Sequence, residues 1–200
     1  MRFACERVGP IVEIQLVRVH SKTLLEARRA MTMIGAVAEL LSPDFVVREG
    51  VLCLAGDADC AQRSQSAYGT VTAVEASCTH VHVLDHFEHG AGLDTPAQGP
   101  DGLDLFYDFG HPDFRAACEI GLAMVYAWAG TLTRSFAGSH FRIYYSERDN
   151  PVVRCHRVRP GEDPWLPDEE VANWGGSGRV VVLDTRDWRL VDSDPSGGAL

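Results

Sequence analysis

The sequence predicts an α+β fold in which a mostly antiparallel sheet carries two main helices and is bordered by long acidic loops. Two long segments have apolar residues at helical spacing, whereas many short segments show the alternation or the β-branched content of strands. Most of the short segments follow one another across turn residues, and a parallel doubly wound sheet would need more helices between its strands. The length of 200 residues suits one core, so we expect a single domain over residues 1–192 and a frayed tail over residues 193–200.

The N-terminal half is predicted to hold the first helix and several short strands. Residues 12–16 alternate apolar and polar side chains, which is typical of a strand with one buried face. Apolar residues then recur at steps of three and four from Leu24 to Leu41, which predicts a helix that ends near Pro43. Residues 45–47 and 51–54 are predicted to form a hairpin or a bulged strand pair. Further strands are predicted at residues 70–74, 80–84 and 103–109.

The C-terminal half is predicted to hold the second helix and two hairpins. Residues 114–132 are apolar almost all round, which predicts a buried helix lying across the sheet. Pro112 suits the first helical position, and Asp113 interacts favourably with the helix dipole. The hairpins are expected to pair residues 141–145 with 152–158, and residues 180–183 with 188–191. Glycine and proline predict long loops at residues 87–102 and 160–178.

Composition argues against several classes of function. The chain has 18 basic and 28 acidic residues, a net charge of -10, which is the wrong sign for a general nucleic-acid binder or for an anionic membrane surface. Lys22 is the only lysine, which indicates the coding bias of a GC-rich bacterial genome. The start lacks the apolar run of a signal peptide, and no window approaches 18 apolar residues. We therefore expect a cytoplasmic bacterial protein with reduced thiols, no nucleic-acid partner and no membrane association.

A segment without lysine or arginine lies between Arg63 and Arg115. Its carboxylates and histidines are Glu75, His80, His82, Asp85, His86, Glu88, His89, Asp94, Asp101, Asp104, Asp108, His111 and Asp113. Carboxylates and imidazoles together bind zinc, iron or manganese. His80 and His82 are two apart on a predicted strand, so both rings face the same side. A third ligand would come from Asp85, His86 or Glu88; alternatively, these residues form a solvated polar face that holds no metal.

The sequence from Thr79 to His86 resembles the T-H-x-H-x-D-H signature of the metallo-β-lactamase fold, with one extra residue before Asp85. The same stretch resembles the cupin pattern of H-x-H followed by a glutamate, through His80, His82 and Glu88, again with one residue too many. Either resemblance covers less than a tenth of the chain. A metal at these residues would imply a hydrolase or an oxygenase.

Arginines are concentrated in residues 134–159. The members of this group are Arg134, Arg142, Arg148, Arg154, Arg157 and Arg159. Guanidinium groups projecting from one sheet face can bind phosphate or carboxylate. The alternative is internal pairing with the acidic loops at residues 94–113 and 162–170.

The loop from Pro160 to Gly178 combines tryptophans with acidic residues. The candidate partner-binding residues are Glu162, Asp163, Trp165, Glu169, Glu170 and Trp174. Aromatic side chains in an acidic setting suit recognition of a basic protein, because tryptophan often anchors interfaces. Alternatively, the two tryptophans fold back over the core as a lid.

These patterns leave two functions from different classes, and whether the protein is an enzyme stays open. The first is a non-catalytic binding or inhibitory protein that docks a basic partner and needs no cofactor. Small acidic α+β immunity proteins of bacterial conflict systems have this general character. The alternative is a metal-dependent hydrolase or oxygenase with its site at residues 80–89. The sequence contains no complete catalytic signature, and the oligomeric state is open.

Overall fold

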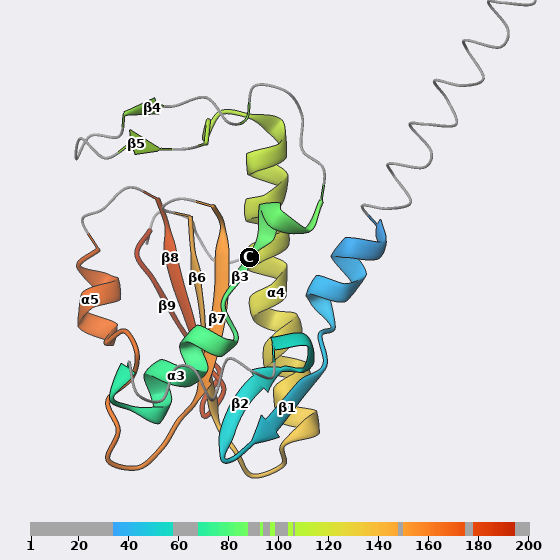
Figure 1. The fold of residues 1–200 in the computed structure, drawn as a ribbon. Coiled ribbons are helices and arrows are strands. Elements are labelled where there is room, and N and C mark those ends of the chain that lie inside the picture. The colour runs from blue at the N-terminus through green and yellow to red at the C-terminus, as the bar shows by residue number, and fades with distance from the viewer. Residues whose placement is uncertain are drawn as a thin grey trace, which may run out of the picture.

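The computed structural model describes residues 34–57, 68–87, 93, 97–98, 104–105, 107–147, 150–174 and 178–194. Its mixture of helices and antiparallel sheets confirms the predicted α+β class (Figure 1). The helices are α3 (Val71–Cys78), α4 (Pro112–Ser135) and α5 (Asp168–Ala172), with a further helical stretch at residues 34–41 and 3-10 turns η1 (Ala55–Asp57) and η2 (Val83–His86). The strand predicted at residues 12–16 and the helix predicted before residue 34 lie outside these ranges.

A five-stranded antiparallel sheet forms the centre of the fold, with strand order β3-β7-β6-β8-β9. Its strands are β3 (Val81–His82), β6 (Phe141–Ser146), β7 (Val152–Arg157), β8 (Val180–Asp184) and β9 (Arg189–Asp192). The smaller sheets pair β1 (Phe45–Arg48) with β2 (Val51–Leu54) and β4 (Ala97–Gln98) with β5 (Asp104–Leu105). The three predicted hairpins, β1–β2, β6–β7 and β8–β9, are confirmed.

The helix α4 covers one face of this sheet along its length (Figure 1). It begins as predicted, with Pro112 at the first position and the Asp113 amide donating to His111 Nδ1 at 3.2 Å. Its buried residues, spaced at three and four, are Phe114, Ala117, Gly121, Met124, Val125, Trp128, Ala129 and Leu132. The predicted burial of α4 holds for this side, whereas Ala123 and Tyr126 on the other face are exposed although they too are apolar.

Two contacts fix the position of α4. A Cβ at Gly121 would lie 2.5 Å from Tyr145 Cε2, so glycine allows the helix to approach the sheet closely at this point. The Trp128 indole donates to the Leu40 carbonyl at 2.7 Å and meets the Phe45 ring edge-on at 5.2 Å between centroids. Trp128 thereby connects α4 to the 34–41 helix and the first hairpin.

By length and composition alone, α4 could also cross a membrane, with a mean hydropathy of 1.2 in an 18-residue window. This test does not separate a membrane span from a core helix, so the expectation of no membrane association stays a prediction. Core helices of soluble proteins have the same composition, and the buried side of α4 joins the core formed with the sheet.

Several predicted strands are wrong or too long. Residues 70–74 begin helix α3, because Thr70 Oγ1 accepts the Ala73 amide at 3.2 Å and caps the helix. Its β-branched residues Thr72 and Val74 are buried in packing that overrides their strand propensity. Of the strand expected at residues 80–84, the structure has only β3, which η2 follows. Of the strand expected at residues 103–109, it describes β5 and no strand at residues 107–109.

The C-terminal segments also depart from expectation. The loop predicted at residues 160–178 contains α5. Of the tail expected to fray, Ser193 is held in place, since its amide donates to the Val180 carbonyl at 2.9 Å and its hydroxyl accepts the Val180 amide at 2.8 Å. Residues 195–200 lie outside the described ranges.

The face of the sheet that is turned away from α4 carries a row of polar side chains. In the register, Arg142 pairs with His156 and Asp184, and Tyr144 pairs with Arg154. Because side chains alternate between faces, these residues all lie on the side opposite the apolar core. Residues 158–174, which we call the covering loop, pack over this face and place α5 on it (Figure 1).

Candidate functional site

The covering loop is fixed to the sheet by a small apolar cluster. Three of its four buried members lie on β6 and β8, and the fourth lies in the covering loop. The cluster comprises Tyr144, Val171, Val180 and Val182, with Leu166, Trp174 and Val191 packed against them. The loop is therefore a packed layer over the second face of the sheet.

Trp165 is the exposed aromatic residue of this layer. The ring of Trp165 meets Tyr144 edge-on at 5.3 Å between centroids, and the Arg154 guanidinium lies over it at 4.2 Å. Such a cation–π contact holds the indole while leaving Trp165 40% exposed. Burial lowers the pKa of Arg154 to about 10, which leaves the side chain charged at neutral pH.

Tyr144 and His156 form a buried pair beneath the loop. The His156 Nδ1 lies 2.9 Å from the Arg157 carbonyl, which can only accept, so Nδ1 carries the proton. The Tyr144 hydroxyl then donates to His156 Nε2 at 2.9 Å. Desolvation lowers the pKa of His156 and raises the pKa of Tyr144, so the imidazole is neutral and the phenol protonated at neutral pH.

A buried carboxylate anchors the start of the covering loop. Glu75 on α3 is fully buried, and its oxygens accept the Leu52 and Arg157 amides, both at 2.7 Å. Glu75 also forms an ion pair with the Arg159 guanidinium. Next along the loop, Glu162 accepts the Thr72 amide at 3.0 Å and the Thr72 hydroxyl at 2.6 Å, and this hydroxyl lowers the pKa of Glu162.

A second set of ion pairs anchors the far end of the loop. Asp168 pairs with Arg142 and, at 2.6 Å, with Arg189. Although partial burial opposes the shift, hydrogen bonds from Arg189 and Arg142 lower the pKa of Asp168. One alternative for the arginines of residues 134–159 was that they pair with acidic loops of the same chain. Arg142 does so, because its partner Asp168 lies in the loop at residues 162–170. Arg159 pairs instead with Glu75 on α3.

The six candidate partner-binding residues divide into two groups. Glu162 is bound to α3, and Trp174 is half-buried in the apolar cluster, so the lid alternative holds for Trp174. The remaining residues, Asp163, Trp165, Glu169 and Glu170, are exposed. They form the exposed acidic group of the covering loop.

The histidine-rich segment brings two of its five candidate ligands together. The rings of His80 and His82 lie 4.4 Å apart, on the same side as predicted. Partial burial, with Arg154 and His82 nearby, lowers the pKa of His80 to about 4. Asp85 accepts a hydrogen bond from the Asn150 amide at 2.8 Å.

Among the residues that the structure describes, no three histidines, cysteines or carboxylates are grouped so as to hold a metal ion. Glu88, one of the five candidates, lies outside those residues. The His80–His82 pair opens instead into a pocket of about 270 Å³ that it shares with Tyr144, Trp165 and Trp174.

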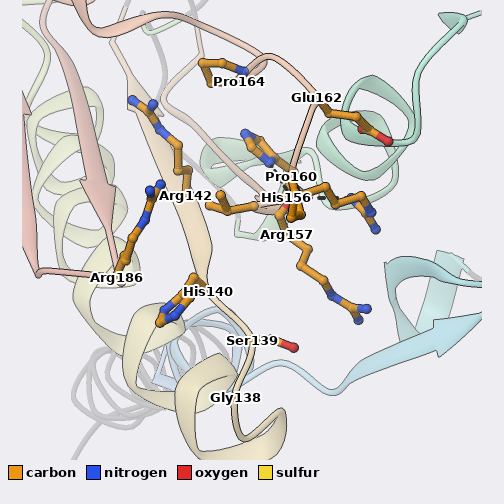
Figure 2. Close-up of a pocket in the computed structure, with 12 residues that line it drawn as sticks. Gly138, Ser139, His140, Arg142, His156, Arg157, Pro160, Glu162, Pro164 and Arg186 are labelled. Carbon is orange, nitrogen blue, oxygen red and sulfur yellow. Dashed lines mark hydrogen bonds between the residues drawn. The ribbon is translucent and has the colours of Figure 1, made fainter.

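A larger pocket, of about 640 Å³, lies at the end of β6 and β7 beneath the covering loop (Figure 2). Arg142, Arg157 and Arg186 line it together with His140 and His156. The sequence pattern singles out the first two arginines but gives no reason to bring Arg186 to them. It places Glu75 only among the carboxylates of the segment between Arg63 and Arg115, although a single carboxylate among the apolar and small residues 71–78 is a signal for a buried anchor.

The fold and its contacts define an α+β protein whose antiparallel sheet has α4 on one face and the covering loop on the other. Comparisons of the chain with protein-family models, with curated proteins and with solved structures found no match.

Proposed function

We propose that this protein is a non-catalytic binding protein, of the inhibitory or immunity type, that docks a basic protein partner. The docking surface is the exposed acidic group of the covering loop, Asp163, Trp165, Glu169 and Glu170. The observation that carries the proposal is the half-exposed Trp165, whose ring is held from the sheet side by Arg154 and Tyr144.

The arrangement around Trp165 suits an interface anchor. A tryptophan whose ring is already fixed loses little side-chain entropy on binding and presents a large apolar area. Asp163, Glu169 and Glu170 form no ion pair with any residue in the described ranges, so their charges are available to a partner. These charges, with the net charge of -10, favour a basic partner and would attract it over long distances.

The buried groups under the loop support binding better than catalysis. His156 is occupied through both ring nitrogens, and desolvation keeps the proton on Tyr144. A substrate would have to displace the hydrogen bond between Tyr144 and His156 before either group could exchange a proton with it.

Replacing Trp165 tests the proposal. We expect Trp165→Ala to bind the partner at least about tenfold more weakly, mainly through faster dissociation, because an anchor acts after docking. Immobilised wild-type and variant proteins would be compared for the proteins they retain from lysate, and the retained partner then measured by surface plasmon resonance.

Tyr126→Ala is the matched control, because Tyr126 is an aromatic residue of α4, 47% exposed and on the opposite side of the sheet. This variant should bind as the wild type does. Retention of the same proteins by the wild type and by Trp165→Ala, with equal dissociation rates, would contradict the proposal.

A metal-dependent hydrolase or oxygenase is the second candidate, favoured by the adjacent rings of His80 and His82. On this alternative, protein purified without a histidine tag contains stoichiometric zinc, iron or manganese by elemental analysis. The double variant His80→Ala/His82→Ala would lose the metal, while His140→Ala, an exposed histidine of the other pocket, would keep it. A metal-free wild-type protein would remove this candidate.

A further inference from the structure

We propose that the smaller pocket, of about 270 Å³, binds a small aromatic carboxylate, whose charged group pairs with Arg154 and whose ring packs against the aromatic side chains under the covering loop. This site does not rest on the docking of a protein partner, because a free small molecule would fill it. The volume is just below the usual range for small-molecule sites, about 300–1,000 Å³, so it suits a ligand of one or two rings.

Arg154 and the side chains around it lie on one face of the sheet. In the register, Tyr144 pairs with Arg154, and His82 pairs with Val152. Because side chains alternate between faces, Val152 and Arg154 are on the same side as Tyr144 and His82. This is the face that the covering loop packs over, and the loop places Trp165 with its ring 4.2 Å from the Arg154 guanidinium carbon. A ligand between the strands and the loop would therefore meet these side chains in one cavity.

Arg154 is the charged group of this pocket. Among the described residues that line it, Arg154 is the only lysine or arginine, and none is a carboxylate. In the part of the chain that the structure describes, its guanidinium forms neither an ion pair nor a hydrogen bond. Burial lowers its pKa to about 10, since it disfavours the charged form. An anion in the pocket would offset this cost, even though the protein as a whole is acidic.

The hydrogen-bond donors of Arg154 are available to such an anion. Its contact with Trp165 is an attraction between a charge and a ring face, and it uses none of the guanidinium N–H groups. A planar carboxylate accepts two parallel hydrogen bonds from one guanidinium fork, and one cation balances its single charge. His80 adds no second cation at neutral pH, because its pKa is lowered to about 4. The pocket therefore favours a carboxylate over a phosphate dianion.

The walls of the pocket suit an aromatic ring. The rings of Tyr144 and Trp165 meet edge-on at 5.3 Å between centroids, and Trp174 comes from the end of the covering loop. Leu166 and Val180 supply aliphatic surface. A ligand ring would gain free energy from the apolar area that it buries and from its contacts with the other rings.

Calorimetric titration with benzoate tests the site, in buffer that contains EDTA so that a metal on His80 and His82 cannot cause the binding. We expect benzoate to bind the wild-type protein. Benzamide has the same ring without the charge, and acetate has the charge without the ring. Both should bind at least about tenfold more weakly than benzoate, because each lacks one of the two groups that the pocket recognises.

Arg154→Gln should weaken benzoate binding by about tenfold or more, since the charge-assisted hydrogen bonds are lost. Arg115→Gln is the matched control, because it makes the same change of charge at an exposed arginine of α4, on the opposite side of the sheet. This variant should bind benzoate as the wild type does.

Arg154→Gln is expected to fold, because it leaves no carboxylate unpaired among the described residues, and its melting temperature without ligand checks this. If it does not fold, amide chemical shifts of the wild-type protein give the answer: benzoate should move the signals of residues 80–82, 152–154 and 165–166. The proposal is overturned if benzoate does not bind, if benzamide or acetate binds as well, if folded Arg154→Gln binds as the wild type does, or if the shifts lie elsewhere.

Discussion

Val125→Asp is expected to lower the free energy of unfolding by about 4 kcal/mol or more, which is a large part of the roughly 5–15 kcal/mol that stabilises a typical domain. Val125 is completely buried in the core that α4 forms with the sheet. An aspartate there would have to remain charged in an apolar surrounding or take up a proton, and either costs free energy. Urea unfolding followed by circular dichroism measures the loss.

Ala123→Asp is the control for this substitution. Ala123 lies two residues away on the exposed side of α4, so the same new carboxylate remains in water. We expect its unfolding curve to lie within about 0.5 kcal/mol of the wild type, apart from the small change in helix propensity. Equal stability of the two variants would show that α4 does not bury the face assigned to it.

Glu75→Ala is expected to cost about 3–5 kcal/mol, because it leaves a partly buried guanidinium without its carboxylate. Two backbone amides, those of Leu52 and Arg157, would also lose their acceptor. Glu75→Gln should cost less, since its amide oxygen still accepts one hydrogen bond, although the ion pair with Arg159 is lost. Thermal and urea unfolding of both variants and of the wild type measures the order of their stabilities.

The control for Glu75 is Glu119→Ala, which removes an exposed carboxylate from α4 and should change stability by less than about 0.5 kcal/mol. A Glu75→Ala protein as stable as the Glu119→Ala protein would mean that the buried ion pair does not hold the covering loop to α3.

The sequence predicted correctly those elements that depend on contacts between residues close together in the chain. Pro112 and Asp113 mark the start of α4, and the turn residues between β8 and β9 mark a hairpin, because capping and turn chemistry depend on nearby residues. Residues 70–74 were wrongly predicted as a strand, because their conformation depends on packing against distant parts of the chain. Their β-branched residues suit a strand, but a cap at Thr70 and burial of Thr72 and Val74 stabilise a helix.

The candidate site was predictable only in part. The loop containing Trp165 combines an aromatic residue with acidic residues, and this pattern is visible in the sequence. The sequence could not distinguish Trp165 from Trp174, because only the packing of the covering loop makes one exposed and the other half-buried. Likewise, the pocket that joins Arg142 and Arg157 to Arg186 depends on strand order across β7, β6 and β8.

The rate of association with the captured partner, measured against salt concentration, tests the docking proposal most directly. Long-range attraction acts on the encounter and is screened by salt, so the wild-type association rate should fall steeply as salt rises. The triple variant Asp163→Lys/Glu169→Lys/Glu170→Lys should associate slowly at low salt and show little or opposite salt dependence. An association rate that ignores salt in the wild type and is unchanged in the triple variant would contradict docking through the covering loop.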